Sequence, residues 1–362
     1  MNQPLLIGIT GTNGKTSVTT MIAQLLNRHG IRAAAIGQRI ETPEGVRSRK
    51  AVSAGPYGLK NYISQLFSEE NIQVFAIEVY SAALAKGLHD SLQYDVAAFT
   101  NITHDHYSVH GDAASYLAAK LRLLNRLTRQ ARLYLDPEAK GLDTIIQQLN
   151  DRKLEYTMPD EWQSQLPAAF IRNNANLAAT IAADVMAGLT VRPARRSIQA
   201  AVNGITLPPG RFERWRLPNQ SIVIIDFAHN PDGLLTIIEA AREITDGNGR
   251  VFLLLSSKGD WGQIKRQAMA DSAATADYVV VTDDDPRHED PAVIRTQLAR
   301  RHRYEQITPR SKAIHYLCQK AGKDDVVIVA GRGADDQWDG PWRRTFYNDQ
   351  AVIKQMKGVL HE

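Results

Sequence analysis

One turn near the start of the chain combines glycines, a lysine and hydroxyl side chains, reading Thr-Gly-Thr-Asn-Gly-Lys-Thr-Ser over residues 10–17. An apolar run over residues 5–9 enters it, and apolar residues at spacings of three and four follow it, as in a helix. Strand, glycine-rich turn and helix favour phosphate binding, because the first helical amides have no internal partner and point at the anion. Lys15 would supply positive charge near the terminal phosphates, and Thr16 would help to hold a magnesium ion.

The match to the general phosphate-loop pattern is incomplete, because that pattern begins with a glycine where this chain has Ile9. The alternative is an ordinary strand-to-helix turn with an exposed lysine. The flanking strand and helix favour the phosphate loop. The residues predicted to bind the nucleotide here are Gly11, Thr12, Asn13, Gly14, Lys15, Thr16 and Ser17.

Three further residues have side chains suited to catalysis. Glu78 ends an apolar strand predicted over 73–79, where an unpaired charge would be costly unless it meets a cation. His106 lies in a histidine-rich stretch over 104–110. A carboxylate and a neutral imidazole beside a phosphate loop suit magnesium, which takes few protein ligands together with phosphate oxygens. Taken singly, Glu78 could be a capping or paired acid, His106 incidental, and Lys120 a solvated helix lysine.

Composition limits the classes of function. The chain has 362 residues, which suggests two domains, and a net charge of +4 from 43 basic and 39 acidic residues. The basic residues are interspersed with acids, so we expect anionic small-molecule substrates and no nucleic acid. The one cysteine, Cys318, excludes a disulfide framework within one chain and is expected to fill the core. No apolar run reaches membrane-spanning length and no signal peptide is evident, so we expect a cytoplasmic protein without a membrane partner.

Alternating strands and helices must position these residues. Strands are predicted over 5–9, 30–37, 73–79, 94–99, 222–226, 251–255, 278–282 and 326–330. Helices are predicted over 59–69, 113–129, 173–186 and 231–244, and residues 38–58 are expected to be irregular. This alternation predicts parallel sheets with helices on both faces and ligands at the carboxyl ends of the strands. The fold class is therefore α/β. A parallel-sheet phosphate-loop ATPase domain over 1–208 precedes a smaller Rossmann-like α/β domain over 209–362, with the linker at Leu-Pro-Pro-Gly over 207–210.

The motif over 10–16 resembles the ATP signature of the Mur ligases, the cytoplasmic amide ligases of peptidoglycan assembly. The resemblance continues through most of the chain. Its further motifs lie at 76–79, 99–106, 110–111, 118–120, 173–177, 210–213 and 226–232. The stretch Thr-Asp-Asp-Asp-Pro-Arg over 282–287, with Glu-Asp-Pro over 289–291, is closest to the MurE type, which adds the third peptide residue.

The resemblance implies roles for individual residues. Lys15 and Thr16 would hold the phosphates of ATP and Mg²⁺, with Glu78 and His106 as further metal ligands. Lys120 would carry a carbamate formed with carbon dioxide, which helps a second magnesium. The residues implied to be catalytic are Lys15, His106 and Lys120. Those implied to bind the nucleotide elsewhere are Asn173 and Asn176 at adenine, Arg211 at phosphate and Asp226 at ribose, the last two from across the domain cleft. Those implied to bind the incoming amino acid are Asp284, Asp285, Arg287 and Asp335, with Arg287 pairing with its carboxylate.

Departures from the family pattern fall on the substrate positions. The N-terminal domain that holds the uridine nucleotide of the family's substrate is expected to have no counterpart. Tyr-Ser-Ala over 80–82 replaces two serines and a histidine, and Leu88 replaces an arginine. Further replacements lie at Ser-Ala-Gly-Pro over 53–56, at Asp-Asp-Pro-Arg over 284–287, where the family has Asp-Asn-Pro-Arg, and at Gly-Arg-Gly-Ala-Asp over 331–335, where it has Gly-Lys-Gly-His-Glu.

These departures predict an ATP-dependent amide ligase that acts through an acyl phosphate. It would join a small-molecule carboxylate other than the nucleotide-linked muramyl peptide to an amino acid. One alternative is a genuine peptidoglycan-precursor ligase that works with a separate carrier or UDP-binding partner. The other is an ATP-binding scaffold without activity.

Overall fold

The computed structural model describes residues 3–48, 52, 55–103, 110–245, 247–260, 262–340 and 343–362. Contacts divide these residues into a first domain that ends at Thr206 and a second that begins at Leu207. Each domain is built on its own seven-stranded sheet. Over the residues described, no helix is both long enough and apolar enough to cross a membrane.

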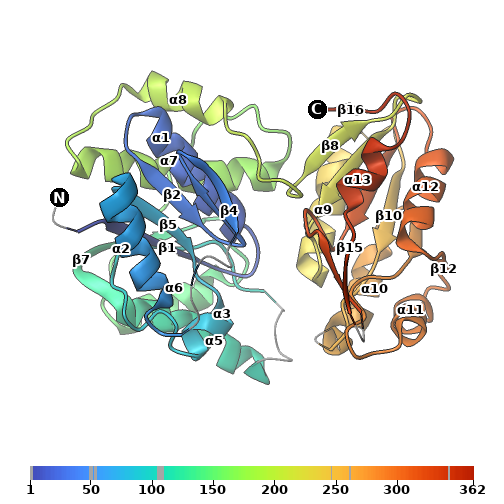
Figure 1. Ribbon diagram of the computed structural model, residues 1–362, viewed down its shortest axis with the longest axis horizontal. Helices are drawn as coiled ribbons and strands as arrows, with labels where there is room; N and C mark the ends of the chain where they lie inside the picture. The colour runs from blue at the N-terminus through green and yellow to red at the C-terminus, as the bar shows by residue number, and fades with distance from the viewer. Residues whose placement is uncertain are drawn as a thin grey trace. The chain divides into compact units, whose positions relative to one another are not determined.

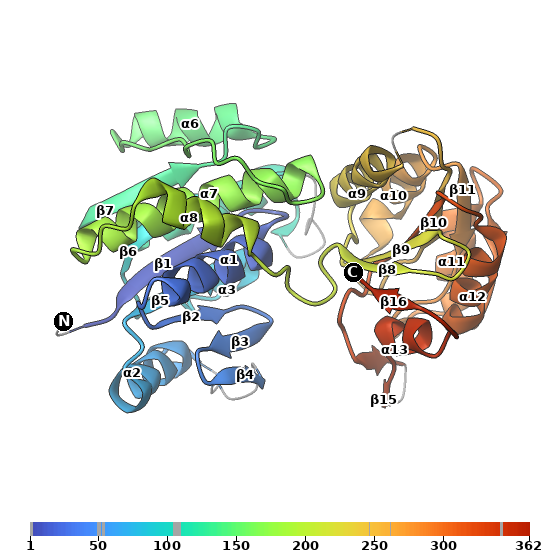
Figure 2. The same ribbon diagram turned by 90° about the horizontal axis from the view of Figure 1, so that it is seen from above.

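The first sheet holds five neighbouring parallel strands and an antiparallel hairpin at one edge (Figure 2). Its order across the sheet is β4 (Gly45–Ser48), β3 (Arg39–Thr42), β2 (Ala33–Ile36), β5 (Val74–Glu78), β1 (Leu5–Thr10), β6 (Tyr94–Phe99) and β7 (Leu127–Leu135). Strand β3 runs antiparallel to both of its neighbours. The central strands β1 and β5 are apolar and almost wholly buried, as parallel strands covered on both faces should be.

Helices cover both faces of this sheet (Figure 1). One face carries α1 (Lys15–Arg28), α7 (Ala169–Gly188) and α8 (Arg195–Asn203). The other carries α2 (Gly58–Glu70), α3 (Ser81–Ala85), α5 (Ala113–Leu121) and α6 (Leu142–Asp151). The chain leaves β1 toward the first face and leaves the neighbouring β5 and β6 toward the second. Such a reversal opens a crevice at the carboxyl end of β1, where open α/β sheets bind ligands.

Two expectations about the first domain were wrong. The helix expected over 113–129 ends at Leu121, tightens to a 3₁₀ turn η2 (Arg122–Arg126) and becomes strand β7. Pairing with β6 buries Leu133 and Leu135 against α6, a gain that outweighs the helical pattern. The stretch 38–58, expected to be irregular, contains the β3–β4 hairpin, whose turn ends in Gly45 at φ 134°.

The second sheet also has a parallel core with antiparallel strands at one edge. Its order is β12 (Glu305–Gln306), β11 (Tyr278–Val281), β10 (Val251–Leu255), β13 (Val326–Ala330), β9 (Ile222–Asp226), β8 (Glu213–Arg216) and β16 (Leu360–His361). One face carries α9 (Pro231–Ile244), a 3₁₀ turn η3 (Gln263–Lys265), α10 (Arg266–Ala273) and α11 (Pro291–Ala299). The opposite face carries α12 (Arg310–Lys320) and α13 (Asp349–Lys354), visible across the sheet from α9 and α10 in Figure 2.

The chain leaves β13 toward the α13 face but leaves its neighbours β9 and β10 toward the α9 face. The second sheet therefore has its own reversal point, at the carboxyl end of β13. A small hairpin of β14 (Gln337–Asp339) and β15 (Arg344–Phe346) follows that strand. Cys318 lies in α12, and burial raises the pKa of its thiol to about 12. The expectation that Cys318 fills the core is confirmed, as is the α/β class of both domains.

Candidate active site

The loop between β1 and α1 depends on two glycines. Gly11 has φ 145°, and a Cβ there would lie 1.9 Å from Thr100 Oγ1. Gly14 has φ 83° and precedes the first turn of α1, which contains no acidic side chain. A Cβ on Gly14 would lie 2.7 Å from Asn174 Oδ1. Both positions therefore require glycine, and the main-chain amides at the start of a helix such as α1 favour an anion.

The residues that follow β6 hold this loop in place. The amide of Asn13 donates to Asn101 Oδ1 at 2.8 Å, and Asn101 Nδ2 donates back to the carbonyl of Asn13 at 3.2 Å. Thr100 Oγ1 donates to the same carbonyl at 2.6 Å. The hydroxyl of Thr12 is 3.0 Å from that of Tyr116 in α5. The loop is thus fixed by hydrogen bonds to the neighbouring strand end and helix.

Thr16 and Glu78, two of the residues predicted to bind a metal ion, lie in contact in the structure. Thr16 Oγ1, in the first turn of α1, donates to Oε2 of Glu78, the last residue of β5, at 2.9 Å. The side chain of Glu78 is buried, 3% exposed, and it makes no ion pair with the residues that the structure describes. Lys15 Nζ donates to the carbonyl of Thr12 at 2.7 Å, so its charge lies over the loop. Ser17 lies in the first turn of α1, and His106 lies outside the described residues.

Lys120 is a buried residue and not the solvated helix lysine of the simplest interpretation. It is 1% exposed, and its Nζ donates to the carbonyl of Gly11 at 2.6 Å. Nζ also lies 4.6 Å from the ring centroid of Tyr116. Burial and the charge of Lys120 lower the pKa of His110, whose Nε2 lies 3.0 Å from Ser81 Oγ. Lys120 therefore contacts the phosphate loop directly.

The asparagines of α7 differ in their contacts. Asn174 is buried and approaches Gly14, whereas Asn173 is half-buried. The side-chain oxygen of Asn176 accepts from the amide of Trp162 at 3.0 Å and so holds the passage that precedes α7. The sequence singled out Asn173 and Asn176 and did not indicate that Asn174 faces Gly14, because that depends on the rotation of the helix about its axis.

In the second domain, Arg211 and Asp226 lie close together. Arg211 stacks over the ring of Phe227, 4.4 Å from its centroid. The carboxylate of Asp226 accepts from the amides of Phe212 and Ala228, each at 2.8 Å. Burial raises the pKa of Asp226, while the charge of Arg211 opposes this shift. The carboxylate thus shapes the turn that holds Arg211.

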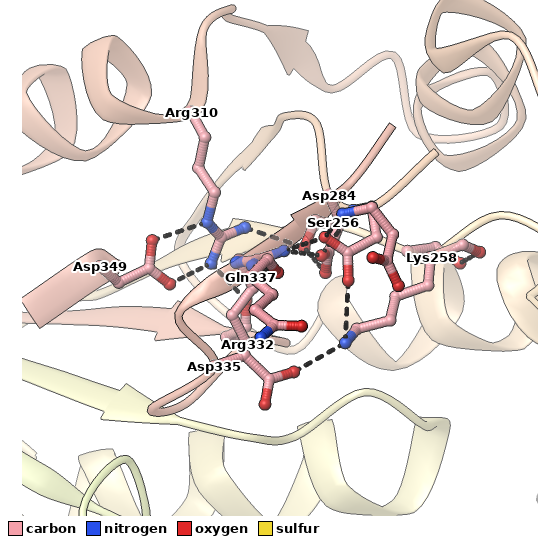
Figure 3. A network of polar contacts seen from close by, with 12 residues as sticks. Ser256, Lys258, Asp284, Arg310, Arg332, Asp335, Gln337 and Asp349 are labelled. Atoms are coloured by element: carbon pink, nitrogen blue, oxygen red, sulfur yellow. Dashed lines mark hydrogen bonds and ion pairs between the residues drawn. The ribbon is translucent and has the colours of Figure 1, made fainter. Parts of the chain in front are cut away.

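A network of charged side chains occupies the carboxyl edge of the second sheet (Figure 3). Arg332, which follows β13, donates from Nη1 to Asp284 Oδ1 at 2.7 Å and to Asp285 Oδ1 at 2.5 Å. Arg332 also donates to the carbonyl of Gln337. Burial opposes the charge of Asp284, but Lys258, Arg332 and Arg310 outweigh burial and hold its pKa well below the ordinary value.

Two more pairs complete this network. Arg310 and Asp349 form a fully buried two-to-two contact, with both hydrogen bonds at 2.8 Å. Arg310 also donates to Ser256 Oγ at 2.9 Å. Lys258 Nζ lies 2.8 Å from Asp335 Oδ2 and 3.2 Å from Asp285 Oδ2. The sequence had placed Asp284, Asp285 and Asp335 at a substrate site, and the structure joins all three through Arg332 and Lys258.

Arg287, the fourth residue predicted to bind the amino acid, lies on the loop after β11. It has φ 54°, and its amide donates to the carbonyl of Asp339 at 3.0 Å, which ties the loop to β14. Lys258, Arg310 and Arg332 were not predicted. A signal was present for Lys258 and Arg332, since both follow buried strands at the sheet edge where ligands bind.

A cavity of about 1020 Å³ lies at the opposite, amino end of the first sheet. Charged side chains from β7, α2 and α7 line it, including Lys60, Arg129, Arg132 and Asp184. Neither the phosphate loop nor Glu78 is among its lining residues, so it is separate from the predicted chemistry.

Comparison with known proteins identifies the family. Residues 9–180 match the profile of the Mur ligase middle domain, and residues 210–333 match that of the Mur ligase, glutamate ligase domain. A UDP-N-acetylmuramoyl-L-alanyl-D-glutamate–2,6-diaminopimelate ligase of Caldanaerobacter subterraneus is 31% identical, over 91% of this chain and 73% of the relative. The chain belongs to the Mur ligase family. It is therefore an ATP-dependent acid–amino-acid ligase, and its resemblance to the MurE type is confirmed.

Solved structures share the fold of this Mur ligase. Folylpolyglutamate synthase of Mycobacterium tuberculosis, complexed with ADP and AMPPCP, has a TM-score of 0.70 at 19% identity, covering 91% of this chain and 88% of that one. A bifunctional folylpolyglutamate synthase/dihydrofolate synthase with Mn, AMPPNP and L-glutamate bound has a TM-score of 0.66 at 19% identity, covering 91% and 87%. The phosphate loop and both sheets thus belong to a fold found with nucleotide and divalent metal.

Proposed function

We propose that this Mur ligase joins a small carboxylate, other than the nucleotide-linked muramyl peptide, to an amino acid through an acyl phosphate. The observation that carries the proposal is the contact of Thr16 with the buried Glu78 beside a loop that requires glycine at two positions. That arrangement supports the handling of a triphosphate, while the altered positions over 80–82 and at Leu88 support a different acid.

The donor set fits a magnesium ion. Glu78 offers a buried carboxylate and Thr16 a hydroxyl, both hard oxygen ligands of the kind magnesium prefers. In our proposal these two residues hold the ion together with His106, and Lys120 carries the carbamate that serves a second ion. Magnesium would neutralise charge on the phosphate oxygens of ATP.

The chain's own groups would promote two steps. In the first, a carboxylate oxygen of the acid attacks the γ-phosphorus, the bond to the bridging oxygen breaks, and ADP leaves. Lys15 and the amides that open α1 would stabilise the charge on the transferred group. In the second, the amine of the amino acid attacks the acyl carbon, phosphate departs, and the amine loses its proton as the amide forms.

The remaining predicted residues keep assigned roles within this proposal. Asn173 and Asn176 would contact adenine, Arg211 phosphate and Asp226 ribose. Arg287 would pair with the carboxylate of the amino acid, because guanidinium and carboxylate match two-to-two. The fold relative with L-glutamate bound supports an amino-acid acceptor. Use of ATP supports a cytoplasmic location.

A substrate screen tests the choice of acid. Purified protein is incubated with ATP, magnesium and pairs of carboxylic acids and amino acids, and phosphate release is measured. We expect turnover with a small acid and none with the nucleotide-linked muramyl dipeptide. Efficient turnover of that dipeptide would instead support a genuine peptidoglycan ligase, the activity that the diaminopimelate-adding relative is named for.

A second experiment separates a ligase from an ATP-binding scaffold. Lys120→Ala removes the amine that would carry the carbamate. A ligase should lose activity and regain part of it when short carboxylic acids are added, because their carboxylate replaces the missing anion. A scaffold should show no such change, and phosphate release that is unchanged in Lys120→Ala, with or without added acid, also contradicts the carbamate role.

A further inference from the structure

Lys258 occupies an unusual place at the carboxyl edge of the second sheet. It follows β10, while Asp285 follows β11 and Asp335 follows β13, so that three strand ends meet at its ammonium group. This edge adjoins the reversal point at β13, where open α/β sheets bind ligands. Figure 3 shows the Lys258 side chain reaching toward Asp335.

We propose that the ammonium group of Lys258 occupies the place between Asp285 and Asp335 that the side-chain ammonium group of a substrate would otherwise take. It thereby restricts the ligase to acceptor amino acids whose side chains carry no ammonium group. This inference rests on the proposed function, which assigns the acceptor amino acid to this edge, and it adds the chemical class of the acceptor.

The carboxylate oxygens of Asp284 and Asp285 already have partners within the protein. Asp285 is 3% exposed; its Oδ1 accepts from Arg332 and from the amide of Asp339, and its Oδ2 contacts Lys258. Asp284 Oδ1 accepts a hydrogen bond from Arg332, and Asp284 Oδ2 accepts one from the hydroxyl of Ser256. A substrate ammonium group would therefore have to displace an internal cation from a buried carboxylate.

Lys258 itself remains charged. Burial alone would lower the pKa of its ammonium group, but the carboxylates of Asp284, Asp335 and Asp285 outweigh burial and raise it. The side chain is 22% exposed, so its positive charge is presented to a ligand at the edge. Its Nζ also lies 5.7 Å from the ring centroid of Phe227, and the guanidinium group of Arg211 stacks over that ring at 4.4 Å. A cationic side chain would meet repulsion here, and a neutral one would not.

L-Norleucine and L-lysine form a matched pair of probes, because they share the same side-chain length and differ in the terminal ammonium group. Their binding to the full chain is measured by calorimetry in the presence of AMPPNP and magnesium. The wild type should bind norleucine at least tenfold more tightly than lysine. Lys258→Met keeps the length of the side chain but removes its charge, leaving Asp285 and Asp335 without their cation. This variant should bind lysine at least tenfold more tightly than the wild type does and should reverse the preference.

Two further variants keep the inference testable if Lys258→Met fails to fold. Lys258→Arg retains the charge and should retain the preference for norleucine. Asp335→Asn removes one carboxylate at a partly exposed position and should widen the ratio between the affinities for norleucine and lysine. If Lys258 had a purely structural role, its replacement would weaken the binding of both amino acids equally.

Three results would overturn the inference: equal wild-type affinities for the two amino acids, an unchanged preference in folded Lys258→Met, or no detectable binding of either amino acid while AMPPNP binds. A protein that binds no AMPPNP at all would contradict the proposed function instead. The two failures are therefore distinguishable in the same titrations.

Discussion

The carboxyl edges of the two sheets both bury charged side chains, but they surround those charges with different partners. In the first domain the buried carboxylate of Glu78 accepts a hydroxyl from Thr16 and has no ion pair among the described residues. In the second domain Arg310 and Arg332 are fully buried against carboxylates. The first edge keeps a carboxylate that a ligand cation can neutralise, whereas the second has neutralised its own charges.

This difference separates the expected effects of substitution. A charged group that is neutralised only when a ligand binds contributes to catalysis and little to folding. Removal of one partner from a buried ion pair instead leaves an uncompensated charge in the folded protein. Variants of the first edge should therefore lose activity, and variants of the second should lose stability.

Lys15→Ala should give the largest effect, and it tests the expectation that variants of the first edge lose activity. Loss of a preorganised charge at the transferred phosphoryl group should lower turnover by about 100- to 1000-fold. The free energy of unfolding should change little, because Lys15 is only half-buried. Phosphate release with an accepted acid–amine pair and urea unfolding provide the two measurements. Lys86→Ala, at an exposed position in the same domain, is the control. Turnover within threefold of the wild type would refute the phosphate role.

Arg310→Met tests the expectation that variants of the second edge lose stability. It leaves the fully buried Asp349 without its partner and should cost about 3–5 kcal/mol of unfolding free energy. Adding Asp349→Leu removes the stranded charge and should restore much of that loss. Urea unfolding of the single and double variants measures both effects. If the double variant is no more stable than the single one, the buried charge is not the cause.

Asp284→Asn tests how the stability of the second edge depends on pH. It should lower the free energy of unfolding by about 2 kcal/mol near neutral pH. Because the folded pKa of Asp284 is lowered, its stabilising contribution is present above the ordinary value near 3.8 and is lost as the pH falls through the lowered value. The difference in unfolding free energy between wild type and variant should therefore stay constant from pH 7 to 5 and shrink only in stronger acid. A difference that vanishes already at pH 5 would contradict the lowered pKa.

Asn176→Ala should give the smallest effect on folding, about 1 kcal/mol, because one hydrogen bond from the amide of Trp162 is lost. Titration with a fluorescent ATP analogue then shows whether Asn176 also contacts adenine. A fall in nucleotide affinity supports that role, and an unchanged affinity limits Asn176 to holding the passage before α7. Asn173→Ala serves as the parallel variant.

The sequence located the strand ends well and their partners poorly. Strands over 94–99, 222–226, 251–255 and 326–330 and the helix over 231–244 have the bounds that were predicted, because short aliphatic runs between polar residues are typical of buried parallel strands. The phosphate loop and Glu78 could be found for the same reason, since each directly follows such a run.

Contacts between distant residues could not be found in this way. Lys258 meets Asp335 only after β10 and β13 pair, and Arg310 meets Asp349 only after α12 and α13 pack together. Neither pairing leaves a local pattern in the sequence. The helix predicted over 113–129 overlaps the first three residues of strand β7, and no strand was predicted over the rest of it, which pairs with the neighbouring β6.

The lone sulfhydryl in α12 has a practical consequence. Because Cys318 is buried and burial raises its pKa to about 12, it should react very slowly with maleimide reagents at neutral pH. Cysteines introduced at exposed positions, one in each domain, would then be labelled without replacing the native residue. Energy transfer between two such dyes would report how the distance between the domains responds to nucleotide in an otherwise natural chain.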